Sequence, residues 1–74
     1  MRITVRLFLS FRAERFHTKV TDYPAGTTVA QVASDLAIPD QNIGLVLVND
    51  RQAAFEHLLG DGDVLALFPV VGGG

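Results

Sequence analysis

Few side chains in this sequence are suited to chemistry. There is no cysteine, so the sequence offers no thiol nucleophile, no thiolate metal site and no disulfide. His17 and His57 are far apart in the sequence and lack the spacing of metal ligands, so we interpret them as surface or structural histidines. Asp61 and Asp63 resemble a paired-carboxylate acid–base site, but their setting in the segment GDGD (60–63) favours a tight turn with unusual glycine dihedrals.

The remaining candidate is the backbone end of the chain, which finishes with FPVVGGG. A glycine run is poor material for building structure, because glycine loses the most conformational entropy on folding. Its lack of a Cβ, however, lets the main chain approach a nucleotide phosphate or enter a narrow channel. At ~3.3–3.6 Å per residue, Val70 to Gly74 would reach ~16–18 Å from the rest of the domain. We therefore expect a folded domain at residues 1–69 and a flexible glycine tail at 70–74.

Two segments near the N-terminus have the pattern of paired strands. In RITVRLFLS (residues 2–10) apolar and polar side chains alternate, which predicts a half-buried strand. The segment FHTKVTDY (16–23) predicts a weaker second strand, and the two would form an antiparallel hairpin. The apolar face of the first strand consists of Ile3, Val5, Leu7 and Leu9.

A helix is predicted at residues 28–37. Thr28 followed three residues later by Gln31 is a capping-box pattern. Pro39 cannot continue the helix and biases the residue before it away from helical dihedrals. One apolar stripe with spacing i, i+3, i+4 and i+7 consists of Val29, Val32, Ala33 and Leu36.

The second half of the chain predicts further strands. IGLVLVND (43–50) is a continuous apolar run, which predicts a central strand covered on both faces and closed by a turn at Asn49 and Asp50. QAAF (52–55) predicts a short edge strand, and HLLGDGD (57–63) a turn of helix followed by a tight turn. VLALF (64–68) predicts a final strand stopped by Pro69.

This order of elements predicts an α+β fold. A single helix must bury its apolar stripe against one face of the sheet. If the first and last strands pair in the middle, they run parallel. The result is a β-grasp (ubiquitin-like) fold, with a four- to five-stranded mixed sheet and one helix packed across one face.

Strand parity predicts a docking surface on the face opposite the helix. With Leu65 and Leu67 directed toward the core, Ala66 and Phe68 point outward, and Phe8 shares that parity. An exposed aromatic residue beside a tail is typical of an interface anchor.

Composition limits the classes of function. The chain has 74 residues, 49% of them hydrophobic and 19% charged, which indicates a single globular domain. Five of its six basic residues lie within the first twenty positions. The net charge of −2 and a pI near 5.4 argue against nucleic-acid binding. No apolar run approaches the ~20 residues of a membrane span, and the first residues lack a signal-peptide pattern, so we expect a cytoplasmic protein without a membrane partner.

The end of the sequence resembles the MoaD/ThiS family of ubiquitin-like sulfur carriers. The resemblance rests on LLGDGDVLALFPVVGGG (58–74) and on VLVND (46–50), and it extends over the whole chain. Phe68 followed by Pro69 is more similar to the small subunits of molybdopterin synthase than to the thiamin carriers. Two features depart from the family pattern: the third glycine, and the valines at positions 70 and 71, where the molybdopterin proteins often have a proline.

The resemblance implies a carrier or protein cosubstrate rather than an enzyme. A ubiquitin-activating-type adenylyltransferase would use ATP and magnesium to adenylate the terminal carboxylate of Gly74, and a sulfur donor such as a cysteine desulfurase would convert it to a thiocarboxylate. The sulfur would pass to molybdenum- or tungsten-pterin cofactor synthesis, with the large subunit of molybdopterin synthase as a further partner. The protein itself would hold no stably bound cofactor and no metal. The expected partner-binding residues are Phe8, Phe68, Pro69, Val70, Val71, Gly72 and Gly73.

Three alternatives remain open at this point. The sulfur could serve thiamin synthesis or tRNA thiolation. The protein could be a ubiquitin-like modifier of target lysines, in which case chain building would be restricted because Lys19 is the only lysine. The domain could also be a plain β-grasp binding module with a tail that has no role.

Overall fold

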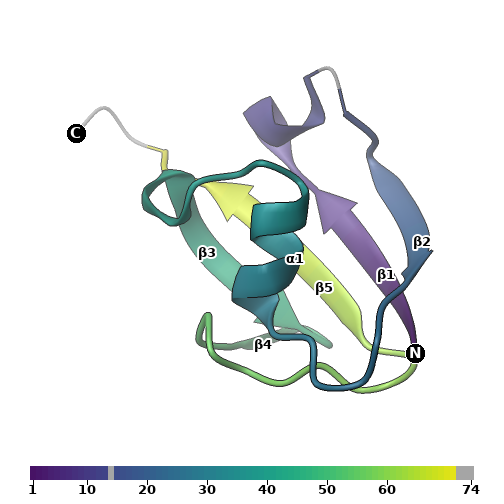
Figure 1. Ribbon diagram of the computed structural model, residues 1–74. Helices are drawn as coiled ribbons and strands as arrows, with labels where there is room; N and C mark the ends of the chain where they lie inside the picture. The colour runs from purple at the N-terminus through teal and green to yellow at the C-terminus, as the bar shows by residue number, and fades with distance from the viewer. Residues whose placement is uncertain (14, 72–74) are drawn as a thin grey trace.

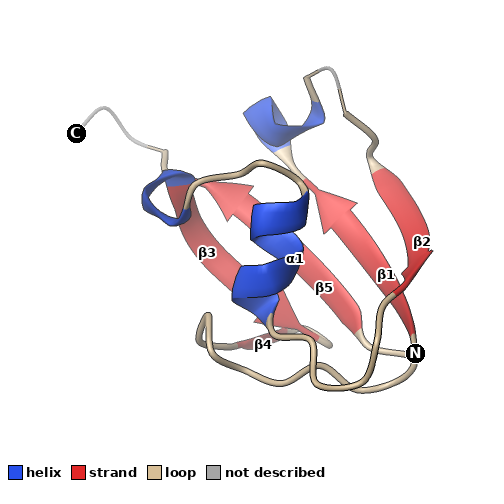
Figure 2. Cartoon of the chain, viewed as in Figure 1, coloured by secondary structure: helices blue, strands red, loops and turns tan. Residues whose placement is uncertain are grey.

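The computed structural model describes residues 1–13 and 15–71, which form one sheet and one α-helix (Figure 1). Two short 3-10 helices, η1 and η2, join the elements (Figure 2). The elements in chain order are β1 (Arg2–Leu7), η1 (Leu9–Arg12), β2 (Thr18–Asp22), α1 (Val29–Asp35), η2 (Asp40–Asn42), β3 (Ile43–Val48), β4 (Arg51–Gln52) and β5 (Val64–Pro69).

The sheet has the strand order β2-β1-β5-β3-β4. The first and last strands lie side by side and run parallel, with Val5 opposite Leu65 and Leu7 opposite Leu67. The other pairs, β1 with β2, β3 with β5 and β3 with β4, are antiparallel. Helix α1 crosses one face of the sheet, as Figures 1 and 2 show. The predicted β-grasp fold, with its central parallel pair, is confirmed.

Helix α1 begins as the sequence predicted. The Thr28 hydroxyl accepts a hydrogen bond from the Gln31 backbone N–H at 3.2 Å, and the Gln31 side-chain oxygen accepts one from the Thr28 N–H at 2.8 Å. This capping box satisfies two of the N–H groups that have no partner within the helix. The helix is shorter than predicted. Its last turn gives way to Ala37 with a φ of 58°, and Leu36 at the C-cap is only half-buried.

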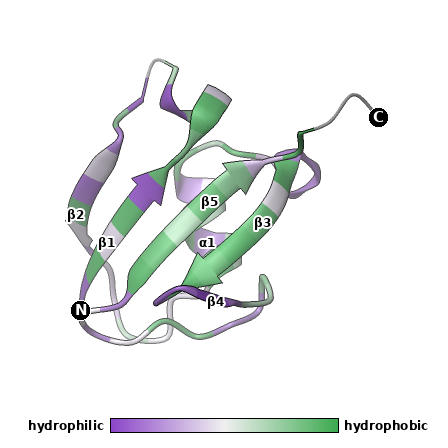
Figure 3. Ribbon diagram, turned by 180° about the vertical axis from the view of Figure 1, so that it is seen from behind, coloured by the Kyte–Doolittle hydropathy of each residue, from purple (hydrophilic) through white to green (hydrophobic). Residues whose placement is uncertain are grey.

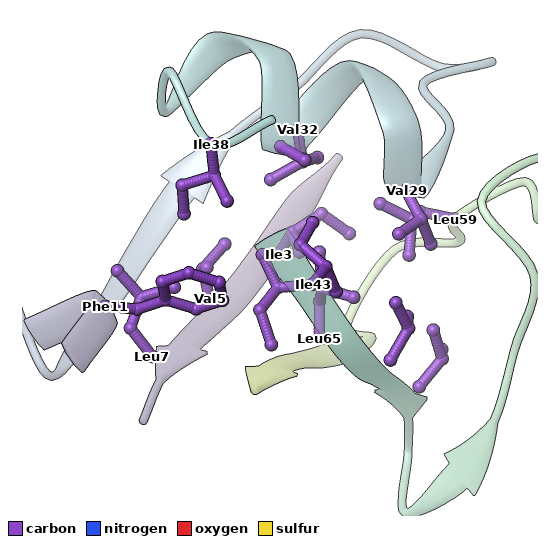
Figure 4. Packing of buried hydrophobic residues seen from close by; sticks show 14 residues of the cluster. Ile3, Val5, Leu7, Phe11, Val29, Val32, Ile38, Ile43, Leu59 and Leu65 are labelled. Atoms are coloured by element: carbon purple, nitrogen blue, oxygen red, sulfur yellow. The ribbon is translucent and has the colours of Figure 1, made fainter. Parts of the chain in front are cut away.

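The core lies between α1 and the sheet (Figure 4). Alternate residues of β1 and β5 supply the sheet side of the core and one stripe of α1 supplies the other, as periods of two and of 3.6 residues require. Thr27 is the one polar residue that is buried in the described part of the chain. The buried cluster consists of Ile3, Val5, Leu7, Phe11, Val29, Val32, Ala33, Ile38, Ile43, Val46, Val48, Leu59, Leu65 and Leu67.

The first strand is shorter than predicted. The alternation of apolar residues continues to Leu9, but β1 ends at Leu7 and the chain turns into η1. Leu9 has a φ of 54°, in the left-handed region, and its side chain is 61% exposed. The turn brings Phe11 into the core instead, so placing Leu9 on the buried face of the strand was wrong.

Two predictions for the second half of the chain were also wrong. Residues 57–63 contain no helical turn. Leu59 donates its N–H to the carbonyl of Thr27 at 3.0 Å and its side chain enters the core, which ties this segment to the start of α1. The short edge strand β4 is Arg51–Gln52 rather than residues 52–55. In the described part of the chain, no helix has the length and apolar character needed to cross a membrane.

Candidate functional site

Phe8 and Phe68 stack on each other on the sheet face that α1 leaves open. Their ring centroids are 4.1 Å apart and their planes differ by 9°. Both side chains are half-buried, and both point away from the core residues Leu7 and Leu67 that precede them in the chain. Figure 3 views the sheet from this side, with α1 behind it. The outward parity predicted for both phenylalanines is confirmed.

The register of the central strands brings the two rings together. Leu7 of β1 lies opposite Leu67 of β5, and the Phe8 N–H donates to the Leu67 carbonyl at 3.3 Å, so the residues that follow are also neighbours. On the other side, β3 places Leu45 opposite Phe68. The parallel pairing of the chain's first and last strands therefore builds the aromatic pair at the end of β5 from which the tail continues.

On β3, the apolar surface of the open face continues beyond the aromatic pair. Leu45 and Leu47 of β3 are half-buried and alternate with the buried Val46 and Val48. Strand β3 is thus covered by the core on one face only, and the prediction of a strand covered on both faces was wrong. Its run of apolar residues reflects this second apolar surface.

Ala66 belongs to the same face but is not exposed. Its parity is outward, as predicted, yet only 7% of it is exposed. Arg6 on β1 and Leu47 on β3 lie opposite it on its two sides, and both have larger side chains. Ala66 is therefore covered by the side chains of its two neighbours and offers little surface for a partner to contact.

Two arginines lie over the Phe8 ring. The guanidinium carbons of Arg6 and Arg12 are each 5.2 Å from the ring centroid, within the range of cation–π attraction. Arg12 is also held by a hydrogen bond from its Nε to the Leu7 carbonyl at 2.7 Å. The aromatic pair thus has a cationic rim on its β1 side. This rim was not predicted from the sequence, although the parity of Arg6 on the first strand was a signal for it.

The tail starts beside this face. Pro69 is buried as the last residue of β5, whereas Val70 and Val71 are 61% and 68% exposed. The predicted site residues Gly72, Gly73 and Gly74 lie outside the described residues. A shallow hollow of about 350 Å³ lies at the base of the tail; its lining residues are Leu9, Gly44, Leu45, Phe68, Pro69, Val70 and Val71.

The histidines and Asp61 do not form a catalytic or metal site. His17 and His57 are both exposed, and Asp61 accepts a hydrogen bond from the Arg2 backbone N–H at 2.7 Å. Among the described residues, no group of histidine and acidic side chains could hold a metal ion.

The 60–63 segment is a turn, and Asp63 fixes it. Its carboxylate accepts hydrogen bonds from the Gly60 N–H at 2.7 Å and from the Asn49 side-chain amide at 2.9 Å. The Asn49 side-chain oxygen in turn accepts the Val64 N–H at 2.9 Å, which joins the β3–β4 turn to the start of β5. Gly62 has a φ of 85°, as predicted, whereas Gly60 has no positive φ. The turn interpretation is confirmed.

The Asp63 network should make stability depend on pH. The bonds from Gly60 and Asn49 hold the Asp63 pKa below its ordinary value of 3.8. Because the folded pKa is depressed, the stabilisation is present above the unfolded pKa and is lost as the pH falls below it toward the folded value. Urea unfolding at roughly pH 6 and pH 3 gives the free energy of unfolding at each pH. The decrease in this free energy from pH 6 to pH 3 should be smaller for Asp63→Asn than for the wild type. An equal loss in both proteins would assign the pH dependence to other carboxylates.

Phe68→Ala should weaken partner binding by at least ~2 kcal/mol, about 30-fold in Kd, because an aromatic anchor in an interface contributes that much. Its loss of stability should be smaller than that of a core truncation, since the ring is half-buried. Phe55→Ala is the matched control, because Phe55 is also half-buried but packs against the core cluster. Titration calorimetry with the activating partner checks affinity, and thermal unfolding checks stability. If Phe68→Ala binds as well as Phe55→Ala does, Phe68 is not an anchor.

Three solved structures resemble the whole domain. SAMP1 of Haloferax volcanii, also described as small archaeal modifier protein 1, has a TM-score of 0.77 at 26% identity over 100% of both chains. A putative molybdopterin converting factor subunit 1 of Pyrococcus furiosus has a TM-score of 0.78 at 22% identity, covering 96% of this chain and 99% of that one. One chain of the complex of subunits 1 and 2 of the molybdopterin-converting factor of Helicobacter pylori matches with a TM-score of 0.68 at 21% identity. The match covers 100% of this chain and 100% of that one.

Curated protein sequences gave no match to this chain. A family model, by contrast, matches almost all of it. The model is that of the ThiS family, and it matches residues 5–74, which include the β-grasp domain, the aromatic pair and the glycine tail. The resemblance seen in the sequence is confirmed, and the chain belongs to the ThiS family of ubiquitin-fold sulfur carriers.

Proposed function

We propose that this protein carries sulfur on its C-terminal glycine, Gly74. In this proposal a ubiquitin-activating-type adenylyltransferase uses ATP and magnesium to activate the carboxylate. A donor such as a cysteine desulfurase then supplies the sulfur, since the chain has no cysteine of its own. The protein acts as a cosubstrate and binds no cofactor stably. Membership of the ThiS family supports the carrier role.

The chemistry explains why activation is needed. A terminal carboxylate has a pKa of roughly 3.3–3.7, so near neutral pH it is an anion and a poor electrophile. Attack of a carboxylate oxygen on the α-phosphorus of ATP releases pyrophosphate and forms an acyl adenylate. The terminal sulfur of the donor's persulfide then attacks the acyl carbon and AMP leaves, which forms an acyl disulfide. A thiol, such as the cysteine supplied with the donor, cleaves the S–S bond reductively, which releases the thiocarboxylate and leaves the thiol as a disulfide with the donor. In this scheme no side chain of the protein takes part in these bonds, because the reacting group is the main-chain carboxylate of Gly74.

The stacked pair Phe8–Phe68 at the end of β5 is the observation on which the proposal depends most. Phe68 is followed directly by Pro69, the last residue of β5, so the surface that would dock a partner lies at the end of the strand from which the tail continues. A partner that binds the aromatic pair is thereby placed within reach of Gly74. The cationic rim of Arg6 and Arg12 favours a partner surface with acidic groups around an apolar centre.

We further propose that the sulfur serves molybdenum- or tungsten-pterin cofactor synthesis. Phe68-Pro69 supports this pathway, as do the names of the Pyrococcus and Helicobacter proteins that share the fold. The Helicobacter structure holds subunit 1 together with subunit 2, so a large synthase subunit is the partner proposed here for the sulfur-transfer step. Supply of thiamin synthesis or tRNA thiolation is the alternative within the same chemistry.

A second candidate function is protein modification. The similarity to SAMP1, at 26% identity over the whole chain, favours it. In that role the activated Gly74 would react with lysine amines of targets instead of with a sulfur donor. Lys19 is the only lysine in the sequence and its side chain is exposed, so any chain of copies joined through lysine side chains would have to use it.

Intact mass spectrometry separates these functions. The protein is incubated with the adenylyltransferase of its own organism, MgATP, a cysteine desulfurase and cysteine. Exchange of one oxygen for sulfur, dependent on ATP, supports the carrier role, whereas adducts with added proteins support the modifier role. Adding the large synthase subunit and the pterin precursor to the thiocarboxylated protein then tests the pathway. If the protein keeps its sulfur in the presence of the large synthase subunit and the pterin precursor, but transfers it to thiamin- or tRNA-thiolation enzymes, the assignment to the pterin pathway is wrong.

A further inference from the structure

The tail leaves the domain in close contact with Gly44. A Cβ placed on Gly44 would lie 3.0 Å from the Pro69 carbonyl oxygen, 3.0 Å from the Val70 Cα and 3.2 Å from the Val70 nitrogen. All three atoms belong to the main chain, so no side-chain rotation could relieve the contact. The pairing of β3 with β5 also shifts register between Ile43 and Leu45, as in a β-bulge. Only glycine lets the two backbones come this close.

A hydrogen bond holds the same point of the chain from the other side. The Val70 N–H donates to the Asn42 carbonyl at 2.9 Å, just before β3 begins. Pro69 lies opposite Ile43 and is buried. The first residue after β5 is therefore fixed between the carbonyl of Asn42 and the bare backbone of Gly44, even though its side chain is exposed.

We propose that Gly44 is a positioning residue, which aims the tail by letting Pro69 and Val70 lie in direct contact with the start of β3. The arm that enters the partner then begins at Val71 rather than at Val70. Four residues span at most ~13–14 Å, instead of the ~16–18 Å of a tail that starts at Val70. This inference rests on the proposed carrier function and specifies how the reacting carboxylate is placed.

The direction of exit matters because docking and reaction occur at different points. The partner binds the rigid face around Phe68, whereas the reaction takes place several residues further on. With docking fixed, a shift at Val70 moves the point from which the tail starts, and the four remaining residues up to Gly74 have to make up that displacement before the carboxylate can react. Misplacement of a reacting group by ~1 Å can lower a rate by ~10²-fold. A substitution that moves Val70 by a few tenths of an ångström should therefore act on turnover more than on binding.

Gly44→Ala tests the inference, with Gly60→Ala as the matched control. No positive φ is involved at either position. A Cβ on Gly60 would meet only the Asp63 carboxylate at 3.7 Å and 4.0 Å, and Gly60 lies near the start of β5, away from the tail. In ATP–pyrophosphate exchange with the adenylyltransferase, we expect Gly44→Ala to lower kcat by roughly tenfold with little change in KM. Gly60→Ala should behave like the wild type.

Val70→Pro tests the anchor without changing Gly44. Proline has no N–H, so the bond to the Asn42 carbonyl is lost while the aromatic pair is untouched. Because Val70 is itself an expected partner-binding residue, the comparison is with Val70→Ala, which removes the same side-chain contacts but keeps the N–H. Val70→Pro should have a lower kcat than Val70→Ala at a similar KM, and Gly44→Ala and Val70→Pro should melt close to the wild type. If kcat is unchanged in both, or if it falls only together with the melting temperature, Gly44 does not position the tail. If the wild type and Gly60→Ala also fail to support exchange, the proposed carrier function itself is wrong, which is a distinct outcome.

Discussion

Replacing Val32 by aspartate is expected to unfold the domain. Val32 is 0% exposed, on the α1 stripe that faces the sheet, and none of the basic side chains belongs to the buried core. An ionised carboxylate at this position would be desolvated without a partner, and a neutral one would leave its polar atoms unsatisfied. Small domains have an unfolding free energy near the lower end of ~5–15 kcal/mol, and a substitution of this kind can remove ~4 kcal/mol or more.

Circular dichroism and urea unfolding measure this effect. Ser34→Asp is the control, because Ser34 is exposed on the same helix. It should change the unfolding free energy by no more than about 1 kcal/mol, mainly through the unfavourable placement of a negative charge near a helix C-terminus. Leu36 would be a weaker test, since it is half-buried at the C-cap. A folded Val32→Asp protein with a melting curve like that of Ser34→Asp would show that the α1 stripe is not essential to the core.

Altering the last residue is expected to abolish the proposed activation while leaving the fold intact. An alanine added after Gly74 moves the carboxylate by ~3.5 Å and introduces a Cβ. Deleting Gly74 withdraws the carboxylate by the same distance and leaves a two-glycine end. We expect a loss of at least ~10²-fold in adenylation for each variant. The last residue of the chain in the buried cluster is Leu67, so thermal unfolding should be nearly unchanged.

The two tail variants have different diagnostic value. If the Gly74 deletion is adenylated at the wild-type rate, the partner does not measure tail length and the third glycine is dispensable. If the alanine-extended protein is also adenylated, and its intact mass excludes trimming, Gly74 is not the reactive residue. Loss of activity together with a lower melting temperature would instead indicate that the tail contributes to the fold.

The parts of the fold that depend on local sequence could be predicted. The capping box of Thr28 and Gln31, the apolar stripe of α1 and the alternation along β1 each follow from neighbouring residues, and the structure confirms them. The element order predicted that the single helix covers one face of the sheet, and that β1 and β5 run parallel if they pair in its middle, which they do. The outward parity of Phe8 and Phe68 followed from these strands, although the stacking itself depends on register.

The features that escaped prediction depend on contacts between distant segments. No glycine or proline marks the turn at Leu9 in the sequence, so the turn could not be predicted. The structure explains it, because the turn brings Phe11 into the core. The segment at Leu59 looked helical because its backbone partner, the carbonyl of Thr27, lies more than thirty residues earlier.

The contact that Gly44 makes with the start of the tail could likewise not be predicted from the sequence. A glycine within an apolar strand suggests a bulge or a close approach, but only the structure shows that Pro69 and Val70 are the segment that approaches. The arginines over Phe8 and the outward leucines of β3 could have been found by extending the parity argument to Arg6 and Leu45. The family, by contrast, could be recognised from the sequence, because the resemblance rests mainly on residues 58–74, and the ThiS family model matches residues 5–74. The reactive role of Gly74 stays a prediction.

The central claim is that sulfur is bound at the carboxylate of Gly74, and locating that sulfur tests it most directly. After incubation with the adenylyltransferase, MgATP and a sulfur donor, the protein is cleaved with trypsin. Arg51 is the last basic residue, so the C-terminal peptide covers residues 52–74. Our account predicts that this peptide alone gains the mass of one oxygen-to-sulfur exchange, and that fragment ions place it on Gly74. An unmodified 52–74 peptide, in a reaction where the partner demonstrably consumes ATP, would contradict the account.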